Sequence, residues 1–171
     1  QLEIETLISL RPELVLLWPD SISASQRQQL RQLGIPLYEA DPHSLDDLAT
    51  QVSEIARRVG RPERGQQLAA QVRETLARLR QEYHRETPLR VFYQVWDQPL
   101  YTLGGRQIVS DALRVCGAEN LFAELALAAP QVNLEAVLVR DPEVILVSEP
   151  QLLAGWQAWP QLRAVQRGQV W

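Results

Sequence analysis

The pattern that most constrains the fold is a short segment that occurs twice, once on each side of a long helical stretch. In the first copy, residues 4–8 read IETLI and lead through Pro12 to the apolar run LVLL at 14–17. In the second copy, LEAVL at 134–138 leads through Pro142 to VILV at 144–147 with the same spacing. Each copy is typical of a short helix, a Pro-Glu turn and a buried parallel strand. Unless the likeness is chance, it predicts two similar lobes.

Strands and helices are predicted to alternate along the rest of the chain. Strands are expected at 14–18, 35–38, 90–94 and 143–147, with helices near 107–116 and 133–139 and a final helix and strand within 156–171. Apolar stripes predict one helix from Leu45 to Val59 and a longer one from Pro62 to about Arg85. This alternation predicts an α/β fold with parallel sheets. We place an N-terminal lobe at residues 1–60, an interlobe helix at 61–87 and a C-terminal lobe at 88–171.

Composition and motifs favour a binding protein over an enzyme. Hydrophobic residues make up 46% and charged residues 22%, which is typical of a globular chain, and the net charge of −4 predicts no nucleic-acid or anionic-lipid partner. No GxSxG elbow, phosphate-binding loop or dinucleotide fingerprint is present. His43 and His84 have no clustered ligands, so we expect neither a metal nor a cofactor. The lone Cys116, beside Val115 on an apolar helix side, is predicted to be buried.

Aromatic residues follow three of the predicted strands. Trp18 and Tyr38 end the first two, and Trp96 and Tyr101 lie in the loop after the third. Residues just past the carboxyl ends of parallel strands face the crevice where ligands bind, and flat aromatic faces suit a planar macrocycle. We therefore interpret Trp18, Trp96 and Tyr101 as ligand-binding residues and Tyr38 as a packing residue. Three further tryptophans are expected to pack the terminal elements: Trp156, Trp159 and Trp171.

Several segments resemble the cobalamin (vitamin B12) periplasmic binding proteins of ABC importers, in the class III family that also includes siderophore and haem binders. The resemblance implies two α/β lobes bridged by one long helix, with the ligand between them. It also implies that the chain, which begins without Met, is truncated at both ends. The matching segments are IETLISLRPELVLLW, LGIPLY, RVFYQVWDQPLYTLGG, LRVCGAENLF, PQVNLEAVLVRDPEVILVS and WQAWPQLRAV.

The resemblance also implies a set of ligand contacts. Trp18 matches an aromatic residue of the first lobe that packs on the corrin, and Tyr101 matches an aromatic residue in the loop of the second lobe. Val95 stands where the best-known member has another aromatic residue, and the adjacent Trp96 is its substitute. Ala129 replaces a tryptophan that contacts the ligand in that member. Gln94 and Asp97 are available to the amide groups at the corrin periphery.

One further match concerns docking. Glu135 matches an acidic residue that docks the second lobe onto an arginine of the membrane permease. A simpler interpretation is an acidic residue in the first turn of a helix, where the helix dipole favours it. The position that matches the docking carboxylate of the first lobe is occupied by Ala24, which has no carboxylate, and Asp20 is the alternative.

These observations predict a periplasmic or extracytoplasmic solute-binding protein that captures cobalamin or a related corrinoid and delivers it to the permease of an ABC transporter. It would contact the membrane only through the transporter or a lipid anchor. A haem or ferric-siderophore carrier is the alternative within the fold. Haem would require an axial Tyr or His in the cleft, and a siderophore would favour clustered Arg. A cytosolic α/β enzyme acting on a nucleotide or tetrapyrrole is the alternative of another class.

Overall fold

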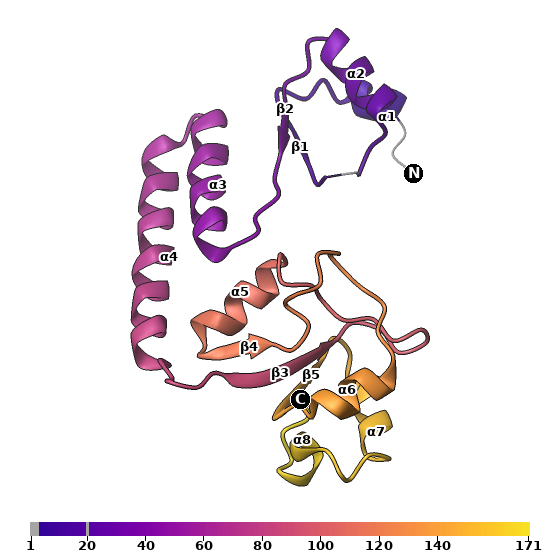
Figure 1. The fold of residues 1–171 in the computed structure, drawn as a ribbon. Coiled ribbons are helices and arrows are strands. Elements are labelled where there is room, and N and C mark those ends of the chain that lie inside the picture. Colours follow the sequence, from indigo (N-terminus) through magenta and orange to yellow (C-terminus); the bar gives the residue numbers. More distant parts are fainter. Residues whose placement is uncertain (1–3, 20) are drawn as a thin grey trace. The chain divides into compact units, whose positions relative to one another are not determined.

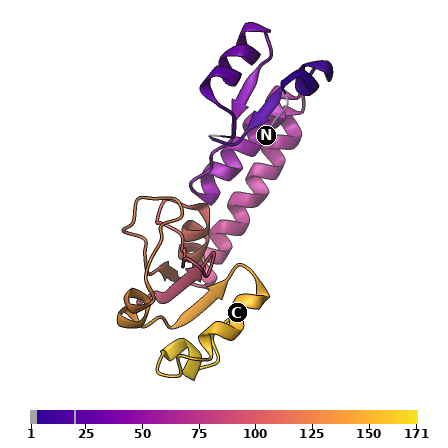
Figure 2. The same ribbon diagram turned by 90° about the vertical axis from the view of Figure 1, so that its right-hand side faces the viewer.

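The computed structural model describes residues 4–19 and 21–171, drawn as ribbons in Figures 1 and 2. Two compact units make up the chain. The first comprises the residues up to Pro42 together with Asp46–Arg73, and the second comprises His43–Leu45 and Glu74–Trp171. None of the described helices is long and apolar enough to cross a membrane.

The first unit begins with a small parallel sheet. Strand β1 pairs with β2, with Val15 opposite Leu37. Val15 and Leu17 point inward and pack with Ile22 and Leu30. The elements are, in chain order, α1 (Ile4–Ser9), β1 (Val15–Leu17), α2 (Ala24–Gln32) and β2 (Leu37–Glu39).

Two longer helices follow, α3 (Leu45–Arg58) and α4 (Pro62–Glu82), and they lie side by side in both ribbon views (Figures 1 and 2). Gly65 makes this close packing possible, because a Cβ atom there would lie 2.3 Å from the Cβ atom of Ala56. Proline is well placed at the first position of a helix, where its missing N–H is not needed. The predicted long helix is therefore confirmed, although it ends at Glu82 and not at Arg85.

The second unit is built on a parallel sheet of order β4-β3-β5, with β3 in the centre. Side chains alternate across it. Phe92 and Ile145 belong to the large core beneath α6, whereas Val91 packs with Leu113 of α5 on the other face (Figure 1). Its elements are β3 (Leu89–Gln94), α5 (Ile108–Val115), β4 (Ala118–Asn120), α6 (Leu134–Arg140), β5 (Val144–Val147), the 3₁₀ turn η1 (Pro150–Leu152), α7 (Leu153–Trp156) and α8 (Arg163–Gln166).

The sequence repeat corresponds to a structural repeat. In each unit a short helix leads to a parallel strand, α1 to β1 and α6 to β5. Arg11 and Asp141, each directly before a proline, adopt left-handed backbone conformations with φ of 48° and 46°. A left-handed residue ends a helix by turning the chain away from its axis. The predicted α/β fold with parallel sheets is confirmed.

Four details differ from the sequence predictions. Strand β4 was not predicted, because it is only three residues long and follows Gly117 without an apolar run. Cys116 is exposed, since it caps α5 and lies past the helix face that packs on the sheet. Trp171 was expected to pack, but it is 64% exposed, although its backbone amide donates to the carbonyl of Ile145 at 2.9 Å. The predicted final helix and strand are two short helices, α7 and α8, and a single bridge between Ile145 and Val170.

Candidate functional site

The loop after β3 folds back on itself at the carboxyl end of the strand. The amide of Val95 donates to the carbonyl of Tyr101 at 2.9 Å, and the amide of Tyr101 donates to the carbonyl of Trp96 at 3.1 Å. The buried Thr102 hydroxyl donates to the carbonyl of Tyr93 at 2.8 Å. These bonds close the loop, so Trp96 is presented from a defined backbone position.

A buried polar network fixes the chain that leaves this loop. Asn120 of β4 donates to the carbonyl of Leu103 at 2.7 Å and to the hydroxyl of Ser110 at 2.9 Å. Ser110 in turn donates to the carbonyl of Gly104 at 3.0 Å. A Cβ atom on Gly104 would lie 2.1 Å from the carbonyl oxygen of Leu127, so only glycine allows this approach. The base of the loop is thereby held against the sheet.

A cavity of about 300 Å³ lies beyond the carboxyl ends of β3 and β5, and we call it the inner cavity. Its wall includes Trp156, whose indole N–H donates to the side-chain oxygen of Gln94 at 2.7 Å. The Trp156 ring also meets Phe92 edge-on, with centroids 5.5 Å apart. Both Gln94 and Trp156 are 4% exposed. The lining comprises Gln94, Asp97, Gln98, Leu100, Leu134, Gln151, Leu152, Gly155, Trp156 and Trp159.

A second cavity, the outer cavity, has a volume of about 400 Å³ and shares residues of its wall with the first. Trp96 lines it and is 54% exposed. The Gln151 amide donates to the carboxylate of Glu149. The lining comprises Trp96, Asp97, Gln98, Glu149, Gln151 and Leu152.

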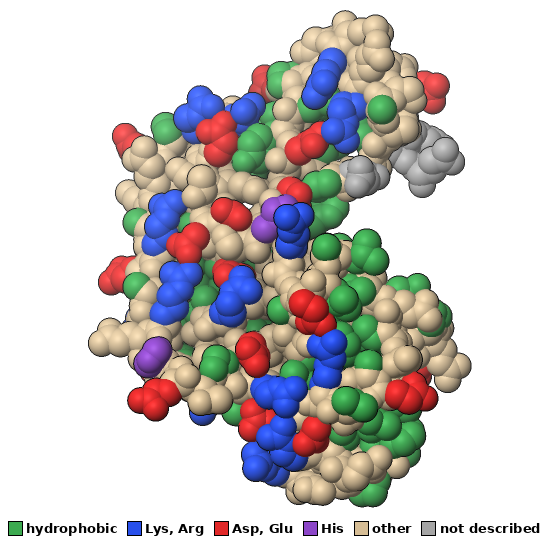
Figure 3. Space-filling view, in the orientation of Figure 1, with side chains coloured by type: hydrophobic (Ala, Val, Ile, Leu, Met, Phe, Trp, Pro, Cys, Tyr) green, Lys and Arg blue, Asp and Glu red, His purple; other side chains and the backbone are tan. Residues whose placement is uncertain are grey.

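Hydrophobic side chains gather at the lower right of Figure 3, where Figure 1 draws α6 and α7. Flat apolar walls with an amide and carboxylate rim can hold a large uncharged planar ligand.

The segment from Glu149 to Trp159 was not predicted to form part of a site. Its tryptophans were interpreted as packing residues, and Trp156 is indeed buried in the core while Trp159 packs against it. Both also line the inner cavity. A signal for them was present in the sequence. Residues just past the carboxyl end of a parallel strand face the ligand crevice, and this segment follows β5, the neighbour of β3.

The other predicted ligand residues have different surroundings. Trp18 follows β1 in the first unit and is 57% exposed. Tyr101 and Val95 are half-buried in the loop and are absent from the lining of both cavities. Val95 accepts a hydrogen bond from the Ser148 hydroxyl at 2.7 Å, which ties the loop to the end of β5. Tyr38 is half-buried, as expected of a packing residue, with the guanidinium of Arg58 4.9 Å from its ring centroid.

Two of the predicted docking positions, Glu135 and Ala24, are on the surface. Glu135 is exposed in the first turn of α6, which is capped by the side chain of Asn133. Ala24 is exposed at the start of α2, and it lines a hollow with Arg27 and Arg31. The surroundings of Ala24 therefore offer positive charge. Asp20 lies outside the described residues. Ala129, which replaces a ligand-contacting tryptophan of the family, is exposed.

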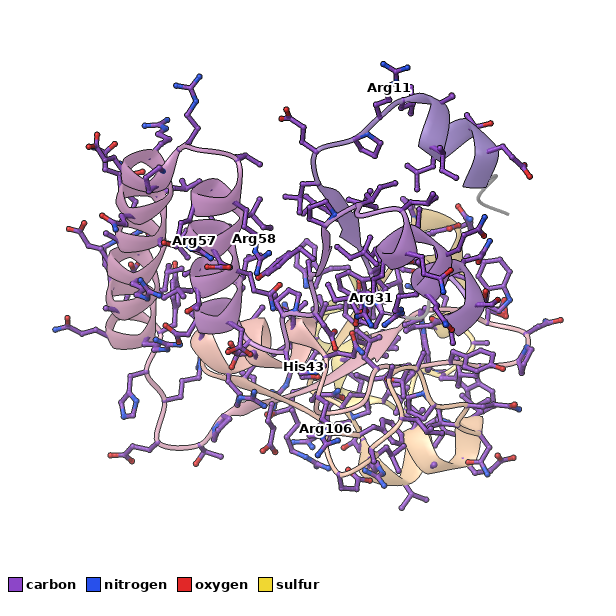
Figure 4. All side chains as sticks on the ribbon, turned by 90° about the horizontal axis from the view of Figure 1, so that it is seen from above. Arg11, Arg31, His43, Arg57, Arg58 and Arg106 are labelled. Carbon is purple, nitrogen blue, oxygen red and sulfur yellow. The ribbon has the colours of Figure 1, made fainter. Side chains whose placement is uncertain are left out.

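Arginine partners lower the pKa of two carboxyl groups, Glu54 and Asp141. In α3, hydrogen bonds from Arg57, opposed by burial and reinforced by Arg58, lower the pKa of Glu54 to about 2. Figure 4 labels the two arginines. For Asp141, burial acts to raise the pKa, but the backbone amide and guanidinium of Arg163 outweigh it and leave the pKa lowered. The Arg163 Nε atom lies 2.6 Å from a carboxylate oxygen of Asp141. Both ion pairs are structural. Among the described residues, no cluster of three or more His, Cys, Asp or Glu side chains could hold a metal ion.

The chain resembles known proteins over its whole length. The sequence model of a family described as periplasmic binding proteins matches residues 1–171. A vitamin B12-binding protein of Vibrio cholerae is 36% identical over 99% of this chain, which spans 63% of that relative's length. The whole relative is therefore considerably longer than the chain described in this structure.

Solved structures share the fold. The crystal structure of the periplasmic vitamin B12 binding protein BtuF of Vibrio cholerae matches with a TM-score of 0.85 and 37% identity, over 98% of this chain and 67% of that one. The periplasmic haem-binding protein HutB of the same organism matches with a TM-score of 0.84 at 22% identity, over 100% of this chain and 71% of that one. At that identity the haem-binding structure supports the fold alone.

Proposed function

The chain belongs to the family of periplasmic binding proteins, and on that premise we propose that it captures cobalamin or a related corrinoid and delivers it to the permease of an ABC importer. The observation that carries the proposal is the 37% identity, at a TM-score of 0.85, to a vitamin B12-binding protein. Family membership also confirms the predicted periplasmic location. The protein would work by binding, with no chemical step.

The cavities of the second unit agree with this ligand. Trp96, Trp156 and Trp159 provide broad apolar faces, and these suit the contact surface of a corrin ring. Trp96, Asp97 and Tyr101 are the loop residues that we propose to contact it, with Trp18 and Val95 as the other contacts taken from the family resemblance. We assign Gln94 two roles. It lines the inner cavity, where it can contact the ligand, and its side-chain oxygen accepts from Trp156 and so holds that wall in place.

Delivery needs a surface that the permease can recognise. We propose Glu135 as the docking residue of the second unit, because its carboxylate is exposed at the start of α6. Long helix α4 would connect the two proposed lobes, residues 1–60 and 88–171. Glu135→Arg should reduce transporter-dependent uptake of cobalamin and leave its binding in solution unchanged.

Haem is the alternative ligand to test, because haem-binding proteins share the fold. Tyr and His are the axial ligands to haem iron that we expect in such a site. In the described part of the chain, neither residue type lines the inner or the outer cavity. The linings of the two cavities therefore supply no axial ligand to haem iron, and Tyr101, the tyrosine that we propose to contact the ligand, belongs to neither lining.

Calorimetric titration tests the proposal directly. The protein produced from its complete coding sequence should bind cyanocobalamin with one-to-one stoichiometry and bind haemin at least about 100-fold more weakly, a difference of about 2.7 kcal/mol. Tight binding of haemin without binding of cyanocobalamin would replace the corrinoid by haem. Binding of neither ligand would reject both.

A further inference from the structure

The polar residues around the two cavities have an unusual charge balance for a site that holds a substituted tetrapyrrole. Apart from the buried Gln94, which accepts from Trp156, they comprise the amides Gln98 and Gln151 and the carboxylates Asp97 and Glu149, a set that we call the polar rim. Among the described residues that line these cavities there is no Arg or His, and the chain contains no Lys at all. The rim therefore offers amide groups and negative charge, with no cation to balance the charge.

The rim groups are open to a ligand. Asp97 and Gln98 are exposed on the loop after β3. Within the described part of the chain, no hydrogen bond or ion pair engages either side chain. Glu149 accepts from Gln151 through one carboxylate oxygen, which leaves the other oxygen available as an acceptor. The rim can thus accept hydrogen bonds from several N–H groups at once.

This chemistry discriminates between classes of tetrapyrrole. A corrinoid has primary amides around its edge, and each amide can donate to a carboxylate and exchange two hydrogen bonds with a glutamine side chain. Haem and many siderophore complexes have carboxylates at their edge, and these would face Asp97 and Glu149 as like charges in a partly desolvated cavity. Rejection of the wrong partner by an unpaired like charge is an established route to specificity.

We propose that the polar rim is a specificity-determining subsite that accepts the neutral carboxamide edge of a corrinoid and rejects carboxylate-bearing tetrapyrroles. The inference rests on the proposed function, because it presupposes that the cavities bind a corrinoid. It adds that Asp97 and Glu149 select the ligand by charge, while the tryptophan walls supply contact area. Gln98 and Gln151 pair with ligand amides.

The test uses cyanocobalamin and its monocarboxylic acids, in which hydrolysis has converted one peripheral amide into a carboxylate. These acids keep the corrin, the cobalt and its axial ligands, so they change only the group that the rim recognises. Affinities are measured by calorimetry at pH 7 for the wild-type protein, made from its complete coding sequence, and for the double variant Asp97→Asn/Glu149→Gln. Glu86→Gln is the matched control, because Glu86 is exposed in the second unit and lines neither cavity.

The wild-type protein should bind cyanocobalamin at least about tenfold more tightly than one or more of the acids, a difference of about 1.4 kcal/mol. The double variant should lose most of this ratio, because it removes the two negative charges that face the carboxylate of the acids. Glu86→Gln should keep the wild-type ratio. Matching thermal unfolding curves will establish that the variants are folded.

The possible failures are distinct. Tight cyanocobalamin binding with an unchanged ratio in the double variant would overturn the subsite and leave the proposed function intact. Wild-type protein that binds the acids as tightly as cyanocobalamin would overturn the subsite in the same way. A wild-type protein that binds no cyanocobalamin would reject the proposed function, and with it the subsite.

Discussion

The two units differ in what their sheets enclose and in what their cavities offer. In the first unit, two strands of three residues each cover a small aliphatic core that includes Leu30. In the second, a three-stranded sheet is covered on both faces, and Phe92 and Trp156 give it an aromatic core. The cavities follow the same division. A cavity in the first unit, beside Glu54, is lined mainly by polar and charged groups, whereas the inner and outer cavities of the second have tryptophan walls.

This difference indicates how a surface loop can be made suitable for binding. A sheet packed on both faces fixes the carboxyl ends of its strands, because side chains on neither face are free to shift. The loop from Val95 to Thr102 and the segment after β5 are therefore anchored on a rigid base. The three-residue strands of the first unit provide a much smaller base. The comparison makes four predictions, given in order of decreasing effect.

The largest effect is expected in the two cores. Phe92→Ala should lower the free energy of unfolding by about 4 kcal/mol, and Leu30→Ala by about 2 kcal/mol, because the larger side chain leaves the larger cavity in the better-packed core. Urea unfolding followed by circular dichroism measures both values. Val139→Ala, at an exposed position on α6, is the control. An equal or larger loss from Leu30→Ala would show that the cores do not differ as described.

The second effect separates binding from stability. Trp96→Ala should weaken cyanocobalamin binding by about 30-fold, or about 2 kcal/mol, because it removes a large aromatic contact. Its side chain is half exposed, so the unfolding free energy should change by less than about 0.5 kcal/mol. Trp171→Ala removes another exposed tryptophan of the same unit, one that lines neither cavity, and should leave binding unchanged. Equal binding losses in the two variants would argue against the loop.

The third effect concerns the bond between Gln94 and Trp156. Gln94→Leu should destabilise the protein by about 1.5 kcal/mol, because it leaves the buried indole N–H without an acceptor. Phe at position 156 has no N–H group, so the same Gln94→Leu change should cost less in a Trp156→Phe background. The four proteins form a double-mutant cycle, read by urea unfolding. Additive losses would mean that this bond contributes nothing to stability.

The smallest effect is a pH dependence. The pKa of Asp141 is below its ordinary value of 3.8, so near that pH the folded state binds fewer protons than the unfolded state. The pair with Arg163 therefore stabilises the fold above pH 3.8, and this contribution is lost as the pH falls through the folded-state pKa. Since both side chains are partly exposed, we expect about 1 kcal/mol or less.

Comparison of wild type with Asp141→Asn, by thermal unfolding from pH 7 to pH 2, measures this contribution. The stability gap between the two proteins should be constant at neutral pH and should narrow in acid below pH 3.8. A gap that stays constant throughout this range would show that the ion pair has no linkage to folding.

Much of the fold could be predicted because its signals are local. Proline and apolar periodicity within a few residues predict the repeat that passes through Pro12 and Pro142 and the long helix that begins at Pro62. Strand β4 could not be found in this way. Its residues Ala118–Asn120 gain their strand conformation by pairing with β3, a contact that depends on the tertiary fold.

The candidate site was predictable in part. The loop with Trp96 and Asp97 was assigned from its place after a strand, and the structure puts both residues in the lining of the outer cavity. Their contact with a ligand stays a prediction. Trp156 was interpreted only as a packing residue. The structure shows that it does both, since it fills the core and also forms a wall of the inner cavity. Its partner Gln94 was interpreted as facing the ligand, since no local pattern indicates a hydrogen bond to a residue so distant in sequence.

The most direct test of the central claim is a crystal structure of the protein, made from its complete coding sequence, with cyanocobalamin bound. We predict that the corrin contacts Trp96 and that ligand amides reach Asp97 and Gln151 at the polar rim. A complex in which cyanocobalamin is bound elsewhere, with the inner and outer cavities of the second unit left empty, would contradict this account of the site.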